Sequence, residues 1–95
     1  MPRAASAAAV RLLREIVDNT AKRIDNELGG QPEVQAELRL TLAQLYFELQ
    51  LYRETEAIAR HTLEMARADL GDENPMVADA LLQRGRALMF LREFD

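Results

Sequence analysis

Two closely similar phrases, LGGQPEVQA from Leu28 and LGDENPMVA from Leu70, divide this 95-residue chain into repeating units. The two phrases begin 42 positions apart. The same separation joins three further pairs: Ala43 with Gly85, Leu49 with Leu91, and Tyr52 with Phe94. A fixed period of this length is typical of stacked supersecondary units. The chain is therefore expected to be a small repeat protein in which each phrase is the joint between two elements.

Apolar residues at steps of three and four predict four helices, over about residues 4–28, 32–49, 54–70 and 75–91. Gly29 and Gly71 are expected to end helices in the left-handed conformation, and Pro32 and Pro75 suit the first turn of the helix that follows. Asn74 is a good N-cap residue. Nothing reads as a strand, so the fold class is all-α, with short loops that make successive helices antiparallel.

The second predicted helix is apolar on more than one side. Its core stripe is predicted to consist of Val34, Leu38, Leu42, Leu45 and Leu49. Leu40, Phe47 and Leu51 lie off that stripe. This helix is therefore expected either to touch neighbours on two faces or to present an apolar strip to a ligand.

The stretch LAQLYFELQLYRETEAIARHTLEMARADLGDENPMVADAL resembles a tetratricopeptide repeat of the long variety found in kinesin light chains and in many bacterial multidomain proteins. The matching residues are Leu42, Ala43, Tyr46, Tyr52, Leu63, Leu70, Gly71, Pro75, Val77 and Ala78. Gln50 and Arg92 replace the family's turn glycine, and Arg84 stands where Leu42 stood in the first unit. The resemblance implies antiparallel helix hairpins stacked as a short right-handed α-solenoid.

The first segment, LLREIVDNTAKRIDNELGGQPEVQAEL, is similar to the opening of the tetratricopeptide region that follows the kinase and membrane segments of some bacterial serine/threonine protein kinases. The resemblance implies that residues 1–95 are one module, a fragment of a longer array in a bacterial signalling protein. The compartment is left open. The cytoplasm is slightly favoured, and an extracytoplasmic position is expected if the module is attached to a receptor-like kinase.

Several classes of function find no support in the residues present. The chain has one serine, Ser6, one histidine, His61, and no cysteine, so no nucleophile and base can be paired and no catalytic, cofactor or metal site is predicted. A net charge of −4 argues against nucleic acid as a partner. Arg11 interrupts the alanine-rich start, which is too short and too weakly apolar for a membrane segment. The protein is expected not to be an enzyme.

In tetratricopeptide arrays the first helix of each unit lines a concave groove. The resemblance places a peptide-binding groove on Glu37, Leu40, Gln44, Phe47, Asp79, Leu82, Arg86 and Met89. Phe47 and Met89 could equally pack against a neighbouring helix. The expected function is a non-catalytic scaffold that binds a peptide or protein segment. The alternatives are a stand-alone adaptor that forms homo-oligomers through uncapped terminal helices and a purely structural spacer.

Overall fold

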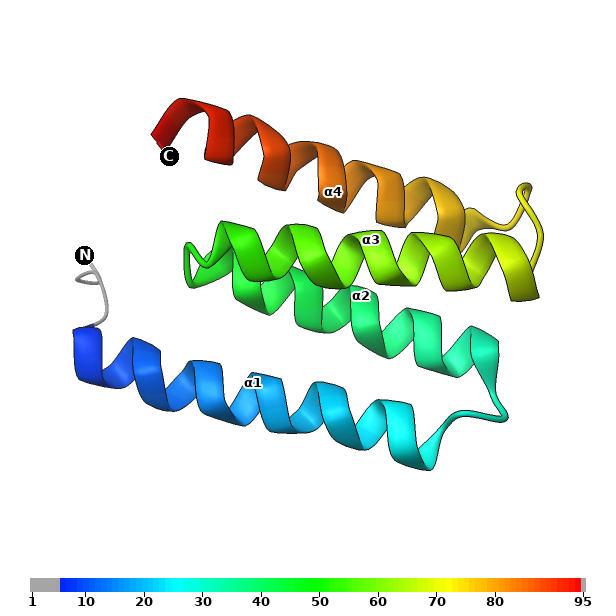
Figure 1. Cartoon of the computed structure of the whole chain (residues 1–95), viewed down its shortest axis with the longest axis horizontal. Coiled ribbons are helices and arrows are strands. Elements are labelled where there is room, and N and C mark those ends of the chain that lie inside the picture. Colours follow the sequence, from blue (N-terminus) through cyan, green and yellow to red (C-terminus); the bar gives the residue numbers. More distant parts are fainter. Residues whose placement is uncertain (1–5, 95) are drawn as a thin grey trace.

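The computed structural model describes residues 6–94 and folds them into four helices (Figure 1). These are α1 (Ala7–Glu27), α2 (Pro32–Glu48), α3 (Tyr52–Asp69) and α4 (Pro75–Phe94). Each helix runs antiparallel to the one before it, so α2 and α4 point the same way. No strand occurs within residues 6–94, and the predicted all-α class is confirmed. None of the helices in this part of the chain is long and apolar enough to cross a bilayer.

The helix bounds differ from the sequence prediction by one residue at the C-terminal ends of α1, α2 and α3, and by two or three residues at the start of α3 and the end of α4. The start predicted for the first helix, at residue 4, lies outside the described residues, and α1 begins after Ser6, whose side chain accepts a hydrogen bond from the Ala9 N–H at 3.1 Å. The third helix begins at Tyr52 and not at residue 54, because the Leu51 carbonyl already accepts from the Thr55 N–H at 3.0 Å. The fourth helix continues beyond residue 91 to Phe94.

Two of the three joints contain a residue in the left-handed conformation. Gly71 has φ 91°, as predicted, and Gln50 has φ 62° in the turn between α2 and α3. The Leu51 N–H bonds to the Tyr46 carbonyl and the Gln50 N–H to the Phe47 carbonyl, both at 2.9 Å, which is the Schellman pattern of a helix end. The prediction for Gly29 was wrong. Its φ is not positive, because α1 closes on Leu28 and the chain turns through a Gln31 N–H bond to the Leu28 carbonyl.

Helix α3 lies between α2 and α4, while α1 packs along the other side of α2 (Figure 1). Two apolar clusters form the core. The first joins α2, α3 and α4 through Leu40, Leu63, Ala66, Val77 and Ala80. The second joins α1 and α2 through Val17, Ile24, Leu42 and Tyr46, with Ile58 of α3 packed against it. The core therefore runs on both sides of α2, as expected for a helix that is apolar on more than one face.

The stripe predicted to bury α2 was partly wrong. Val34, Leu38 and Leu45 are exposed, and we call them the α2 surface stripe. The residues that α2 buries are Gln35, Ala36, Leu40, Leu42, Ala43 and Tyr46. The buried residues of α2 form one arc of the helix, which α1 and α3 cover together, and Val34, Leu38 and Leu45 lie beside this arc, where neither helix covers them.

Polar contacts tie α1 to the rest of the molecule. The Tyr46 hydroxyl donates a hydrogen bond to the Asp18 carboxylate, and Arg39 of α2 pairs with Asp25. Arg14 reaches α3, where its Nη2 lies 2.5 Å from a Glu54 carboxylate oxygen. Burial raises the pKa of the Tyr46 phenol well above its ordinary value, and the Asp18 carboxylate raises this pKa further.

A second set of polar contacts holds α4 to α3. Arg84 stands at the repeat position of the buried Leu42, and its Nε donates to Glu56 at 3.1 Å. Arg60 donates to the same carboxylate oxygen at 3.3 Å. A partly buried arginine is tolerated at this core position because Glu56 neutralises its charge.

Candidate functional site

A hollow of about 550 Å³ lies between α2 and α4, on the side of these helices opposite α3. It exists because the two helices point the same way and are held together from behind by α3. Five of its lining residues come from α2, namely Glu37, Leu40, Thr41, Gln44 and Leu45, and three come from α4, namely Met76, Asp79 and Gln83.

The floor of this hollow is a chain of side-chain amides. Gln44 Oε1 accepts from Gln83 Nε2 at 3.3 Å and from Arg86 Nη1 at 3.4 Å, while Gln44 Nε2 donates to Glu48 at 3.1 Å. These neighbours fix which way both amides point, since Arg86 can only donate and Glu48 accepts. The Gln83 Oε1 atom is left buried with no hydrogen-bond partner among the described atoms. An acceptor in this position favours a ligand that brings an N–H group.

The entrance carries acidic and apolar groups. Glu37 and Asp79 are exposed near the N-terminal halves of α2 and α4. Leu45, a member of the α2 surface stripe, lines the hollow, and Leu38 is exposed one helical turn before Thr41 on the same helix. The hollow therefore offers hydrogen-bond acceptors beside an apolar edge.

The structure brings together four of the eight residues predicted to form a groove, namely Glu37, Leu40, Gln44 and Asp79. Leu40 is only 7% exposed because most of its side chain packs in the core, so its contribution to any ligand contact is small. Leu82 and Met89 are 60% and 70% exposed but do not line the hollow.

The remaining two predicted residues, Phe47 and Arg86, belong to an aromatic cluster at one end of the hollow. The rings of Phe47 and Phe90 meet edge to face at 5.1 Å between centroids, and Tyr52 stacks on Phe90 at 4.8 Å. The Arg86 guanidinium lies 4.1 Å from the Phe47 centroid. Of the two interpretations left open for Phe47, the structure therefore favours packing, here against α3 and α4 of the same chain.

Leu45 of the α2 surface stripe, the Gln83 amide and the Thr41 hydroxyl belong to the lining of the hollow but were missed as site residues. The stripe was assigned to the core because its spacing is that of a buried helix face. Nothing in the local sequence marks Gln83, because its role depends on where Gln44 lies on a different helix.

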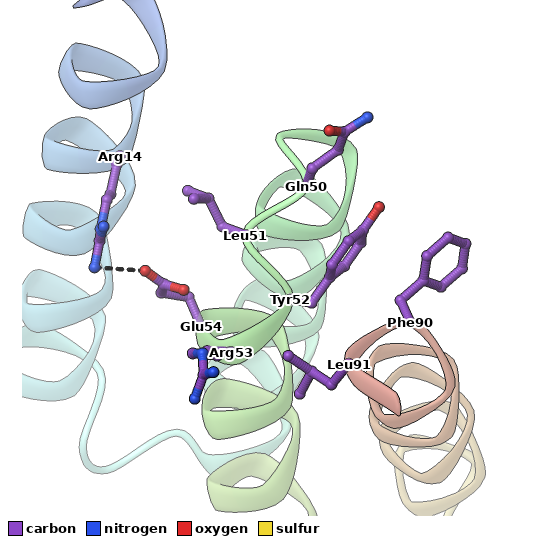
Figure 2. Close-up of a pocket in the computed structure, with 8 residues that line it drawn as sticks. All are labelled: Arg14, Gln50, Leu51, Tyr52, Arg53, Glu54, Phe90 and Leu91. Atoms are coloured by element: carbon purple, nitrogen blue, oxygen red, sulfur yellow. Dashed lines mark ion pairs between the residues drawn. The ribbon is translucent and has the colours of Figure 1, made fainter. Parts of the chain in front are cut away.

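A larger hollow, of about 720 Å³, opens beside the turn between α2 and α3 (Figure 2). Arg14 of α1 points across it toward Glu54, and the rings of Tyr52 and Phe90 stand along its other wall. Arg14 and Glu54 form an ion pair with each other, and the rings of Tyr52 and Phe90 stack on each other. Its lining also includes Gln50 and Arg53.

The single histidine lies apart from the hollow between α2 and α4. His61 is exposed on α3, next to a small hollow that also contains Asp25 and Arg39. Within residues 6–94 no group of three or more histidine, aspartate or glutamate side chains could hold a metal ion. Comparison of the chain with protein-family models, curated proteins and solved structures gave no match.

Proposed function

We propose that this protein is a tetratricopeptide-like module that binds a short, extended protein segment in the hollow between α2 and α4. The observation that carries the proposal is the buried, unpartnered Gln83 Oε1 beside the exposed carboxylates of Glu37 and Asp79. An extended segment supplies backbone N–H groups for such acceptors.

The repetition of helix contacts along the chain supports the solenoid arrangement. Ile24 and Leu28 of α1 pack toward α2, and their equivalents 42 positions later, Ala66 and Leu70 of α3, pack toward α4. Helix α2 also contacts α4 directly. A stack in which each unit repeats the contacts of the last leaves the first helices of successive units side by side, where they form a continuous binding wall.

The chemistry of the wall defines the class of ligand. Acidic groups at the entrance favour a segment with a lysine or arginine, and Leu45 and Met76 favour an apolar side chain next to it. No group placed to act as a nucleophile or base enters this proposal, so the module holds its ligand without changing it.

A peptide array tests the proposal. Ten-residue peptides of varied sequence are probed with the labelled chain and with two variants, Glu37→Lys/Asp79→Lys and the control Glu64→Lys. Glu64 is exposed on α3 and does not line the hollow. We expect the wild-type chain and the control to retain peptides that pair a basic with an apolar residue, and the double variant to bind them about tenfold more weakly. If all three proteins retained the same peptides, the hollow would not be the site.

The link to bacterial serine/threonine kinases rests on the likeness of the first segment alone. We propose that the module works as a docking or sensing part of such a signalling protein. Sequencing the source locus on both sides of the coding stretch tests this idea. A kinase domain in the same reading frame would support the proposed role, and unrelated flanking genes would contradict it.

A further inference from the structure

Helix α4 has an exposed apolar face that no part of the described chain covers. The face consists of Ala78, Leu82, Gly85 and Met89, which we call the α4 outer face. Nothing lies within 4 Å of the point where a Cβ of Gly85 would stand. The steps of four, three and four residues place these positions on one side of the helix.

The repeat shows what this face is built to contact. The positions 42 residues earlier are Ala36, Leu40, Ala43 and Phe47 of α2. Ala36 and Ala43 are fully buried, Leu40 packs against Leu63 and Ala66 of α3, and the Phe47 ring meets Tyr52 at 5.4 Å. On α2 this pattern of small, leucine, small and large residues is thus the face that receives α3. The same pattern on α4 is open.

Helix α1 carries the matching half of that contact. Its exposed residues Leu13, Ile16 and Thr20, which we call the α1 outer face, stand 42 positions before Thr55, Ile58 and Thr62 of α3. Thr55 and Thr62 are fully buried, and Ile58 packs against the cluster that contains Leu42 and Tyr46. Ile58 is therefore one of the residues with which α3 approaches α2, and the two threonines lie on the same side of α3.

One local detail is reproduced between the two helices. Thr62 Oγ1 donates to the Ile58 carbonyl at 2.7 Å, and Thr20 Oγ1 donates to the Ile16 carbonyl at 2.8 Å. The Thr62 hydroxyl can be buried without loss because its hydrogen bond is made inside its own helix. Thr20 is exposed but has already made the same bond, so burying it against another helix would cost little.

We propose that the α1 outer face of one molecule docks on the α4 outer face of the next, in the way that α3 docks on α2 within the chain. The occupant of each face is a second copy, because the chain itself holds both halves of the contact and leaves both exposed. Gly85 lets the backbones approach, and Leu82 and Met89 pack against Ile16 and its neighbours. Since the two faces differ, the contact is head to tail, and successive copies form either a ring or an open row.

Sedimentation equilibrium of the wild-type chain is the first test. The mean mass should rise above the 10.8 kDa of one chain as its concentration increases from about 10 µM to about 1 mM, the range set by a contact of moderate strength. A mass that stays at one chain throughout would overturn the proposal. A monomeric chain that nevertheless bound a synthetic peptide of residues 52–70 would assign the α4 outer face to a helix of another protein, and would overturn it too.

Two complementary variants then test the head-to-tail geometry. Leu82→Glu spoils one face and Ile16→Glu the other. Both residues are about 60% exposed, so the fold should be retained, as circular dichroism can check. Each variant alone should be monomeric. An equimolar mixture should form one species of twice the mass of a chain, because the intact α4 face of one variant meets the intact α1 face of the other.

The control is Leu38→Glu, which changes an exposed leucine of α2 that lies on neither outer face. It should self-associate like the wild-type chain. If the Ile16→Glu variant still self-associated while Leu82→Glu did not, α4 would be pairing with its own copy, and the head-to-tail contact would be wrong. A mixture of the two variants that remained monomeric would contradict it equally.

Discussion

Helices α1 and α3 occupy equivalent positions in the 42-residue repeat but are packed in different ways. Helix α3 lies between α2 and α4, and the residues it buries are mostly small: Thr55, Ala59, Thr62 and Ala66 have no exposed surface. Helix α1 packs along α2, buries the larger Val17 and Ile24, and leaves Leu13 and Ile16 exposed.

The difference shows how the number of neighbours selects the side chains of a helix. A helix between two others must let both approach, so its buried positions hold alanine and threonine, and the threonine hydroxyls bond within the helix. A helix with one main neighbour can use larger side chains. Here α1 adds charged and polar contacts through Arg14, Asp18 and Asp25, which compensate for its smaller buried surface.

The largest loss of stability should come from removing a buried side chain from the contact between α1 and α2. Tyr46→Ala removes a ring that is 5% exposed, together with its bond to Asp18, and should lower the free energy of unfolding by about 3–5 kcal/mol. Urea denaturation followed by circular dichroism measures this loss. Tyr52→Ala is the matched control, because removing that half-buried ring should lower the free energy of unfolding by less. Equal losses would show that the contact between α1 and α2 contributes no more to stability than the aromatic cluster.

Enlarging a buried side chain at equivalent positions of α1 and α3 should show which of the two helices is packed more tightly. Ala59→Leu places a large side chain between α3 and its neighbours and should cost about 1–3 kcal/mol, whereas Val17→Leu on α1 adds one methylene beside α2 and should cost less than about 1.5 kcal/mol. Thermal melts of both variants provide the comparison. A larger loss for Val17→Leu would mean that α1 is the more tightly packed helix.

Removing one hydroxyl tests the polar contact of α1 alone. Tyr46→Phe keeps the ring but loses the bond to Asp18, and should cost about 1–2 kcal/mol at neutral pH. Since the pKa of Tyr46 is raised in the folded protein, its stabilising effect is complete below the unfolded tyrosine pKa of about 10 and declines as the pH rises above it. Urea titrations at pH 7 and above pH 10 should therefore show the gap between wild type and variant narrowing. A gap that stayed constant would mean that Tyr46 ionises as easily in the folded state as in the unfolded one.

The smallest effect should be a gain at the turn that leads into α3. Gln50 has φ 62°, a conformation that suits glycine better than a residue with a Cβ. Gln50→Gly should raise the free energy of unfolding by about 1 kcal/mol or somewhat less, because glycine also gains freedom in the unfolded chain. A rise in the melting temperature of the variant would show this gain in stability. Destabilisation would indicate that the Gln50 side chain makes a contact that outweighs the backbone strain.

The local sequence determined the helices and most of their ends. Steps of three and four residues located all four helices, Pro32 begins α2 at its first turn, and Gly71 and Asn74 act at the joint before α4 as expected. Such signals act within one or two turns of the chain, so they can be read without knowing the fold. The same short range explains the error at Gly29, where the turn follows hydrogen bonds that the glycine alone does not specify.

Only the tertiary structure decided which apolar residues are core and which are surface. The spacing of apolar residues placed Leu38 on the predicted core stripe and Leu40 off it, yet Leu40 packs against α3 and α4 while Leu38 faces outward. The outcome depends on the directions from which α1 and α3 approach α2, and a single helix cannot encode its neighbours' positions. For the same reason the sequence predicts only the helix faces on which Glu37, Gln44 and Asp79 lie. The packing of α2 beside α4 brings these three residues around one hollow.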